Sequence, residues 1–309
     1  MRISVIVLVY ENIDYLSRNI KSIFMQNHND IEIIVQDDGS TSFNINDIKN
    51  QFINVPKNIK RYVISSNENN MGTVVNYNRA LDKAEGDIIV PLACDDFFLN
   101  EYVLTKIEKF FLENREYKVC TACYKYENYE TIYPSKEDCL LLQNNETEII
   151  QNRLYISNFI SGSVLYWKRD FLIEIGKFDT TYILVEDYPI VLKLLELGYH
   201  IGFIDMVAIN KGKDGVSGRE KVIKGKNGKI KIDAKRVKDQ YVMSNLYRLE
   251  RKTRRLIKAC YELEFSEYRY VSVLKYFDVW LQVLIKYVVD KKIKKIPFDV
   301  SHIIKIYKE

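Results

Sequence analysis

Glycine and cysteine are both scarce in this sequence, and neither follows a familiar cofactor-binding pattern. The 309 residues include 12 glycines and 5 cysteines. No Gly-x-Gly-x-x-Gly and no Gly-Lys-Ser/Thr occurs, which argues against a dinucleotide-binding loop and a P-loop. The cysteines are scattered, and Cys120 and Cys123 have no second pair with which to hold zinc. These features predict a protein of a reducing compartment without a disulfide framework.

Long apolar runs are also missing. No run of about 18 or more apolar residues appears, so we expect no membrane-spanning helix. The apolar opening, residues 3–10, is too short for a signal peptide and is followed at once by Glu11. The three histidines lie far apart and form no recognisable cluster. We therefore expect a cytoplasmic protein.

The net charge of +4 hides an uneven distribution along the chain. Residues 1–210 contain 20 basic and 30 acidic side chains, whereas residues 211–309 contain 26 basic and 12 acidic ones. The two parts are therefore expected to face different partners. A basic tail suits nucleic-acid binding, but this one lacks a known motif and the acidic part would repel a phosphate backbone. We expect no nucleic-acid partner and keep a nucleic-acid-binding protein as the alternative.

Strand and helix patterns alternate through the first hundred residues. Apolar runs of strand length occur at residues 2–10, 31–36, 61–65 and 86–93, with helical spacing between them. This order predicts an α/β fold, with a mostly parallel open sheet flanked by helices. Ligands in such sheets collect beyond the carboxyl ends of the strands.

Paired carboxylates follow two of these runs, as Asp37-Asp38 and Asp95-Asp96. Neighbouring carboxylates repel each other, and a divalent cation between them and a phosphate relieves that repulsion. An acid after the second strand can also accept the imide N–H of uracil or thymine. The alternatives are structural: Asp95 can cap the helix at residues 100–114, and Asp37 and Asp38 can bond nearby backbone N–H groups.

Several motifs in order and in register resemble family 2 glycosyltransferases of the GT-A, Rossmann-like fold. They are Ser4-Val5-Ile6-Val7-Leu8-Val9-Tyr10, Asp37-Asp38-Gly39-Ser40-Thr41, Asn70-Met71-Gly72, Asn78-Arg79-Ala80, Asp95-Asp96, Gly162-Ser163, Gly176-Lys177-Phe178-Asp179 and Glu186-Asp187. The resemblance covers residues 1–210. It implies a nucleotide-sugar half at about residues 1–115 and an acceptor half at about residues 116–210.

In the nucleotide-sugar half, the resemblance assigns roles by position. Tyr10 and Gly72 are implied to contact the nucleotide, with Tyr10 against the base. Asp38, with Asp37 beside it, is implied to read the pyrimidine N3–H. Asp96 is implied to bind Mn²⁺ or Mg²⁺, and Asp95 to face the ribose or sugar and to share the metal. Ala93 stands where many members have a first Asp, and Glu11 replaces the usual Asn.

In the acceptor half, Asp187 matches the catalytic base, and a carboxylate there can take the proton of an attacking hydroxyl. Glu186 and Trp167 are candidates for the acceptor site. Both assignments have structural alternatives. An acid pair can simply favour the start of the helix at residues 188–197, and Trp167 can belong to an aromatic core.

The last hundred residues are basic. Residues 211–230 are rich in glycine and lysine, which predicts a flexible basic loop. From the resemblance, Lys213, Asp214 and Arg219 are expected to contact the donor as this loop closes. Residues 231–309 predict a basic helical region. Such a region suits an anionic membrane surface, as a peripheral attachment on the inner face of the plasma membrane, or alternatively a solvated face or a homodimer interface.

The resemblance implies an inverting, metal-dependent glycosyltransferase of the hexosyltransferase type. We expect it to move a sugar from a nucleotide-sugar donor, with UDP as the nucleotide, to a glycan or polyprenyl-linked acceptor in capsule or other surface-polysaccharide synthesis. An inactive nucleotide-sugar-binding scaffold is a further alternative, although Asp96 and Asp187 are both retained.

Overall fold

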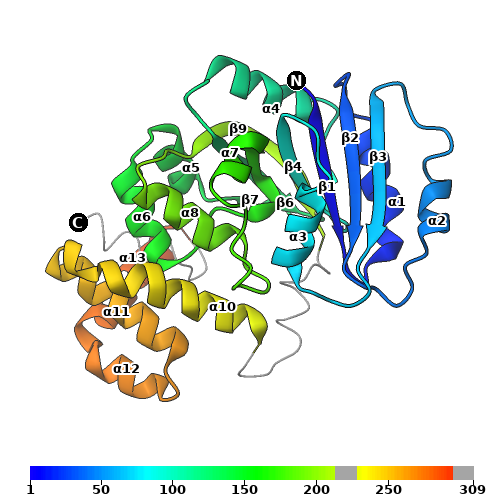
Figure 1. Ribbon diagram of the computed structural model, residues 1–309. Coiled ribbons are helices and arrows are strands. Elements are labelled where there is room, and N and C mark those ends of the chain that lie inside the picture. Colours follow the sequence, from blue (N-terminus) through cyan, green and yellow to red (C-terminus); the bar gives the residue numbers. More distant parts are fainter. Residues whose placement is uncertain (213–227, 295–309) are drawn as a thin grey trace. The chain divides into compact units, whose positions relative to one another are not determined.

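The computed structural model describes residues 1–212 and 228–294 (Figure 1). These residues form two compact units. The first consists of Met1–Ile150 and Phe159–Ala234, and the second of Gln151–Asn158 and Lys235–Glu309. The sequence gave no sign that residues 151–158 belong with the second unit. Most of the predicted basic loop, with Lys213, Asp214 and Arg219, lies outside the described residues.

One nine-stranded sheet organises the described part of the first unit, in the order β3-β2-β1-β4-β8-β6-β9-β5, with β7 paired to β6. The strands are β1 (Ile3–Val9), β2 (Ile31–Asp37), β3 (Ile59–Ser66), β4 (Ile88–Ala93), β5 (Phe97–Phe98), β6 (Val119–Tyr126), β7 (Ile132–Tyr133), β8 (Leu165–Lys168) and β9 (Gly202–Lys211). The long ladders β3-β2-β1-β4 and β6-β9 are parallel, and the antiparallel ladders are two or three residue pairs long. The predicted α/β class and mostly parallel sheet are therefore confirmed.

Helices cover both faces of this sheet. The helices of the first unit are α1 (Ile13–Phe24), α2 (Ile45–Asn50), α3 (Thr73–Leu81), α4 (Val103–Glu113), α5 (Lys136–Gln143), α7 (Arg169–Glu174) and α8 (Asp187–Glu196). Helices α6 (Thr147–Ile156) and α10 (Lys229–Val237) each run from the first unit into the second. Helix α1 buries Leu16, Ile20 and Ile23 in one core with alternate residues of β1, β2 and β4, and α4 packs in the same cluster. Helix α3 lies on the opposite face (Figure 1). Strands covered on both sides are buried throughout, which explains the continuous apolar runs of β1 and β4.

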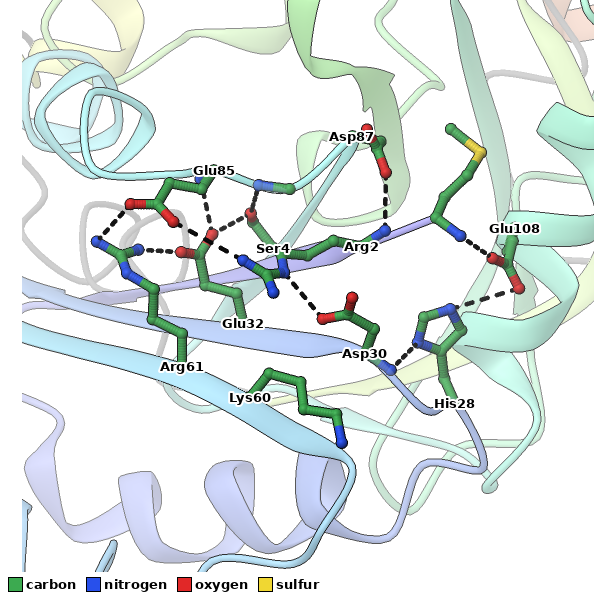
Figure 2. A network of polar contacts seen from close by, with 12 residues as sticks. Arg2, Ser4, His28, Asp30, Glu32, Lys60, Arg61, Glu85, Asp87 and Glu108 are labelled. Atoms are coloured by element: carbon green, nitrogen blue, oxygen red, sulfur yellow. Dashed lines mark hydrogen bonds and ion pairs between the residues drawn. The ribbon is translucent and has the colours of Figure 1, made fainter.

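The amino edge of the parallel strands carries a network of paired charges (Figure 2). Glu32 on β2 is fully buried and accepts hydrogen bonds from Arg61 of β3, the Ser4 hydroxyl of β1 and, at 2.9 Å, the Glu85 backbone N–H. Arg61 also contacts the Glu85 carboxylate at 3.2 Å. These contacts hold the segment before β4 against the first strands of the sheet.

The second unit is helical where it is described. It contains the π-helical turn Lys238–Val242, the 3-10 segment Met243–Arg248, α11 (Arg251–Phe265), α12 (Arg269–Lys275) and α13 (Phe277–Lys294). The buried ammonium of Lys238 donates to Glu264 of α11 at 2.6 Å and to the Ile156 carbonyl at 3.2 Å. Within residues 1–212 and 228–294, no helix is long and apolar enough to cross a membrane.

Candidate active site

A pocket of about 610 Å³ lies at the carboxyl ends of the parallel strands. In the ladders Val9 pairs with Asp37, and Leu8 pairs with Ala93, so β1, β2 and β4 end side by side. The charged residues that line the pocket in the described chain are Asp38, Asp95, Asp96, Glu186, Asp187 and Lys211. Tyr10 lines it as well. The structure therefore brings together acids that the sequence placed in two separate halves.

The two acids at the end of β2 have different surroundings. Asp37 is fully buried and accepts hydrogen bonds from the backbone N–H groups of Gly39 and Ser40, both at 3.0 Å, and from the Ser66 hydroxyl at 2.6 Å. Asp37 does not line the pocket, so the structure does not support the nucleotide contact expected of it. Asp37 instead stabilises the turn after β2. The side chain points away because alternate residues of a strand face opposite sides.

Asp38 does line the pocket and also organises the start of α3. Its Oδ1 accepts from the Asn67 amide at 2.8 Å and from the Met71 N–H at 2.9 Å, and its Oδ2 accepts from the Gly72 N–H at 2.9 Å. Gly72 caps α3 with a φ of +89°. Its contact with the pocket is thus indirect, through Asp38, and Thr73 is the neighbouring residue that lines the pocket.

Asp95 and Asp96 form a buried pair just after β4. The Asp96 Oδ1 accepts the backbone N–H of Gly212 at 2.9 Å. A side chain at position 212 would collide with Asp95, because a Cβ there would lie 2.4 Å from the Asp95 Oδ2. Burial, with the neighbouring Asp95 charge, raises the pKa of Asp96 to about 7, although Lys211 and the Gly212 N–H oppose that rise. The pair therefore holds negative charge at an energetic cost that a cation would relieve.

The Asp96 Oδ2 is buried and has no hydrogen-bond partner within the described part of the chain. An orphaned carboxylate oxygen that faces a pocket fits a hard divalent cation. No group of three or more metal-binding side chains occurs in residues 1–212 and 228–294. Mg²⁺ is commonly bound by one or two carboxylates together with substrate phosphates and water.

Glu186 and Asp187 lie at the start of α8 and touch Gly162. The Gly162 N–H donates to the Asp187 Oδ2 at 2.8 Å, and the Tyr188 N–H donates to the Asp187 Oδ1 at 2.7 Å. A Cβ at position 162 would lie 2.6 Å from the Glu186 Oε1, so a larger residue there would displace this acid. Burial and the Asp187 charge raise the pKa of Glu186 to about 8. Burial also raises the pKa of Asp187, against the hydrogen bonds from Gly162 and Tyr188.

Lys211 is a site residue that the sequence did not single out. It ends β9, lies opposite Tyr126 in the β6-β9 ladder and is the only cation among the described residues that line the pocket. Its ammonium donates to the Ser161 hydroxyl at 3.1 Å and lies 4.8 Å from the centre of the Tyr124 ring. Its charge lowers the pKa values of Asp96, Glu186 and Asp187 toward their usual range.

Asp233 on α10 is a second residue that sequence reasoning missed. Its buried Oδ2 accepts three successive backbone N–H groups, from Ile183 at 2.9 Å, Leu184 at 2.7 Å and Val185 at 3.2 Å. The Ile183 carbonyl in turn accepts the Val74 N–H of α3 at 3.2 Å. One carboxylate thus holds the segment that leads directly into Glu186 and Asp187.

Trp167 is not where the acceptor assignment expected it. It lies on β8 with 1% of its surface exposed, packs edge-to-face with Phe178 at 6.0 Å, and does not line the pocket. Trp167 therefore belongs to an aromatic core, which was the structural alternative that the sequence offered. Strand β8 lies between β4 and β6 in the sheet, so this ring packs in the core beside the sheet.

Tyrosines of the β6-β7 hairpin occupy the rim instead. Tyr126, Tyr129 and Tyr133 line the pocket, and Tyr129 and Tyr133 are 54% and 39% exposed. The Tyr133 ring stacks on the Tyr124 ring, with 5.5 Å between the ring centres, and meets the Tyr126 ring edge-to-face, with 5.6 Å between the centres. Burial, the neighbouring tyrosines and the Asp187 charge raise the pKa of Tyr124, which puts this cluster within electrostatic reach of Asp187.

Fold and pocket together define a class: an α/β protein with an acidic ligand site at the carboxyl edge of a parallel sheet. The sequence matches the model of glycosyl transferase family 2 over residues 4–176, more than half of the chain. The chain belongs to glycosyl transferase family 2.

Curated relatives agree with this family. The chain is 35% identical over 109 residues to a GalNAc(5)-diNAcBac-PP-undecaprenol beta-1,3-glucosyltransferase of Campylobacter jejuni. The match covers 35% of this chain and 34% of that protein. The curated relatives that it matches are covered over 24% to 43% of their length.

Two solved structures share the fold at low identity. The chain is similar to S. aureus TarS 1-349 in complex with UDP-GlcNAc, with a TM-score of 0.60, 19% identity, and 86% of this chain and 74% of that one covered. It is also similar to the mannosyltransferase PcManGT of Pyrobaculum calidifontis in complex with GDP-Man and Mn²⁺, with a TM-score of 0.59, 14% identity, and 90% and 74% covered. The fold is the GT-A fold.

Proposed function

We propose that this protein is an inverting, metal-dependent glycosyltransferase that uses a UDP-sugar. It transfers the sugar to a hydroxyl of a glycan or polyprenyl-linked acceptor during synthesis of a bacterial surface polysaccharide. The observation that carries the proposal is the meeting, in one pocket, of the acids after β2 and β4 with the half-buried acid pair at the start of α8.

The donor's nucleotide is assigned to the ends of β1 and β2. Asp38 faces the pocket with both oxygens already fixed by N–H groups, so its position is set before a ligand arrives. A fixed carboxylate can accept the imide N–H of uracil. Tyr10 supplies an aromatic ring at the same end of the pocket. The fold neighbour that was solved with UDP-GlcNAc supports a UDP-sugar. Because another was solved with GDP-Man, the nucleobase of the donor should be tested directly.

Asp96, with Asp95 beside it, would hold the divalent cation through its orphaned oxygen. When bound, the cation would stabilise negative charge on the departing diphosphate. Lys211 adds a positive charge at the same end of the pocket, and so favours a phosphate-bearing ligand over a neutral one.

Asp187 is assigned as the base. It takes the proton of the acceptor hydroxyl as that oxygen bonds to C1 of the sugar, while the bond from C1 to the diphosphate oxygen breaks and UDP leaves. The raised pKa of Asp187 makes it a stronger base than an exposed aspartate. Glu186, with a pKa near 8, is protonated at neutral pH and can donate a hydrogen bond. A single displacement of this kind inverts the configuration at C1.

The acceptor is proposed to bind on the side of the β6-β7 hairpin. Tyr129 and Tyr133 present exposed aromatic surface at the rim of the pocket, and such rings pack well against the apolar face of a sugar. The Campylobacter jejuni relative is named for an undecaprenol-linked acceptor. A lipid-linked acceptor would place the protein at the cytoplasmic face of the plasma membrane.

The test is UDP release from a panel of UDP-, GDP- and dTDP-sugars, with water or simple glycosides as acceptors, in Mn²⁺ and in EDTA. We expect release from at least one UDP-sugar, lost in EDTA and in Asp96→Ala, with an inverted product by NMR. Release with retained configuration would overturn inversion. Binding of donor without any turnover would favour the inactive scaffold.

A further inference from the structure

Two free cysteines lie side by side in the first unit, outside the pocket. Cys123 on β6 and Cys139 on α5 place their Sγ atoms 3.5 Å apart. The Cys139 Sγ also lies 3.6 Å from the Pro134 carbonyl oxygen, just before α5. Cys123 is buried and Cys139 is half-buried, so the pair can be reached from solvent on the Cys139 side. Neither cysteine lines the pocket, and the proposed transfer reaction uses neither.

The contact between the two sulfurs makes them chemically different. The hydrogen bond from Cys139 lowers the pKa of the Cys123 thiol, although burial and the Asp205 charge oppose this change. The same hydrogen bond, together with burial, raises the pKa of Cys139. The thiolate is the nucleophilic form of cysteine, so Cys123 is the sulfur that reacts first. Cys139 is then placed to attack the oxidised Cys123, as the second cysteine of a redox-sensing pair does.

The backbone around Cys123 is irregular. The β6-β9 ladder changes register on both sides of this residue, so a regular ladder does not fix the strand there. The sulfurs must approach by about 1.5 Å to reach the disulfide bond length of about 2.05 Å. Rotation of the half-buried Cys139 side chain about its first torsion can supply a movement of this size.

We propose that Cys123 and Cys139 are an oxidation site at which hydrogen peroxide forms a reversible disulfide. The Cys123 thiolate attacks the peroxide O–O bond and becomes a sulfenic acid, while the hydroxide that leaves takes up the proton that Cys123 released. The Cys139 sulfur then attacks the sulfenic sulfur, the S–S bond forms, and the second hydroxide leaves with the Cys139 proton as water. Two thiols thus lose two electrons, and the peroxide is reduced to two waters. A reducing compartment returns the pair to thiols once the oxidant is gone.

The disulfide would close residues 123–139 into a covalent loop. This loop carries Tyr126, Tyr129 and Tyr133 of the pocket rim, and its strand β7 pairs with β6 over two residue pairs. A crosslink at its base removes freedom from a segment that few ladder contacts hold, so its backbone amides should exchange hydrogen more slowly. Since neither cysteine lines the pocket, the disulfide can be tested whether or not the transfer reaction is correct.

The experiment treats the reduced full chain with a small excess of hydrogen peroxide and counts free thiols after unfolding in urea. We expect the wild type to fall from five thiols to three, and dithiothreitol to restore all five. Mass spectrometry of tryptic peptides should show a crosslink, lost on reduction, between residues 119–125 and 137–153. Amides of residues 127–132 should exchange at least about twofold more slowly after oxidation.

The variants are Cys123→Ser, Cys139→Ser and, as the matched control, Cys260→Ser. The first two should each lose the crosslink, and Cys139→Ser, at the half-buried position, keeps the test available if Cys123→Ser does not fold. Cys260 is half-buried in the second unit and burial raises its pKa to about 11, so Cys260→Ser should form the crosslink as the wild type does.

Three results would overturn the proposal. The first is a wild type that keeps all five thiols under peroxide. The second is a crosslink that persists in Cys123→Ser, which would assign the bond to Cys120 of the same tryptic peptide. The third is a crosslink that persists in Cys139→Ser. Equal amide exchange over residues 127–132 before and after oxidation would overturn the expected effect on the hairpin.

Discussion

The two edges of the parallel strands both contain buried carboxylates, but in opposite surroundings. At the amino edge, Glu32 is fully buried and is met by a guanidinium, a hydroxyl and a backbone N–H (Figure 2). At the carboxyl edge, Asp96 and Glu186 have pKa values raised to about 7 and about 8, with burial as the main cause. A buried acid that is fully partnered stabilises one arrangement of strands, whereas an acid such as Asp96, with one oxygen left without a hydrogen bond, has a site for a ligand cation.

The largest effect should come from Asp187→Asn, which keeps the shape of the base and removes its ability to take a proton. We expect the rate of UDP release to fall by about 10³-fold. The melting temperature should fall slightly, because the Asn amide can accept only one of the two N–H groups that Asp187 accepts. A variant that keeps more than a tenth of the wild-type rate would contradict the assignment of Asp187 as base.

At the other edge, Glu32→Gln should cost stability instead of activity. Removing the charge leaves Arg61 without its buried partner, although its contact with Glu85 remains. We expect a loss of about 3 kcal/mol, at the lower end of the range for buried pairs because Arg61 is partly exposed. Urea unfolding measures the loss, and UDP release per folded molecule should be unchanged. A tenfold drop in that specific rate would show that the two edges are not separate in function.

Gly162→Ala should disturb the acid pair without removing either acid. The new Cβ would lie 2.6 Å from the Glu186 Oε1, so Glu186 must move, and we expect a rate loss of about 10²-fold. Gly198→Ala is the control. It strains a backbone with a φ of +82° but meets nothing within 4 Å, so it should lower stability by about 1 kcal/mol and leave the specific rate intact. Equal rates for the two variants would refute the close-packing argument.

Asp233→Ala should act on Asp187 through the segment 183–185. Losing the acceptor of three N–H groups loosens that segment, and we expect kcat to fall by about tenfold while KM for the donor changes little. Asp233→Asn keeps a carbonyl oxygen and should restore most of kcat. If both variants lowered stability and left kcat unchanged, Asp233 would be structural only.

The smallest effect concerns pH. Because the folded pKa of Glu186 is about 8 and its usual value is 4.5, the folded state binds more protons than the unfolded state between these values. Stability therefore falls as pH rises through this window. In urea unfolding at several pH values, Glu186→Gln should lose less stability across the window than the wild type. Glu113→Gln, at an exposed helical position, should follow the wild type; an unchanged slope in Glu186→Gln would contradict the raised pKa.

Local pattern was enough to predict the carboxyl edge of the first four strands. The runs that end near Val9, Asp37 and Ala93 are continuous and apolar because both faces of the sheet are covered, and parallel strands bring their ends together. Family resemblance, and not periodicity, singled out Asp187. That it lines the same pocket as Asp96 could be seen only in the structure.

The residues that were missed depend on pairing between distant segments. Lys211 reaches the pocket because β9 pairs with β6, 85 residues away at the Tyr126–Lys211 position, and nothing near Lys211 in the sequence marks it as a site residue. Asp233 acts through a segment 48 to 50 residues earlier. Trp167 was misplaced because aromatic composition alone does not distinguish a core strand from a pocket wall.

The most direct test of the central claim is a calorimetric titration of the full chain with UDP in Mn²⁺, repeated with Asp96→Asn and with Glu32→Gln. The account predicts metal-dependent UDP binding, lost in EDTA and in Asp96→Asn and kept by folded Glu32→Gln, with weaker binding of GDP. A chain that binds a short RNA but not UDP would contradict it and would move the function to the basic residues after position 210.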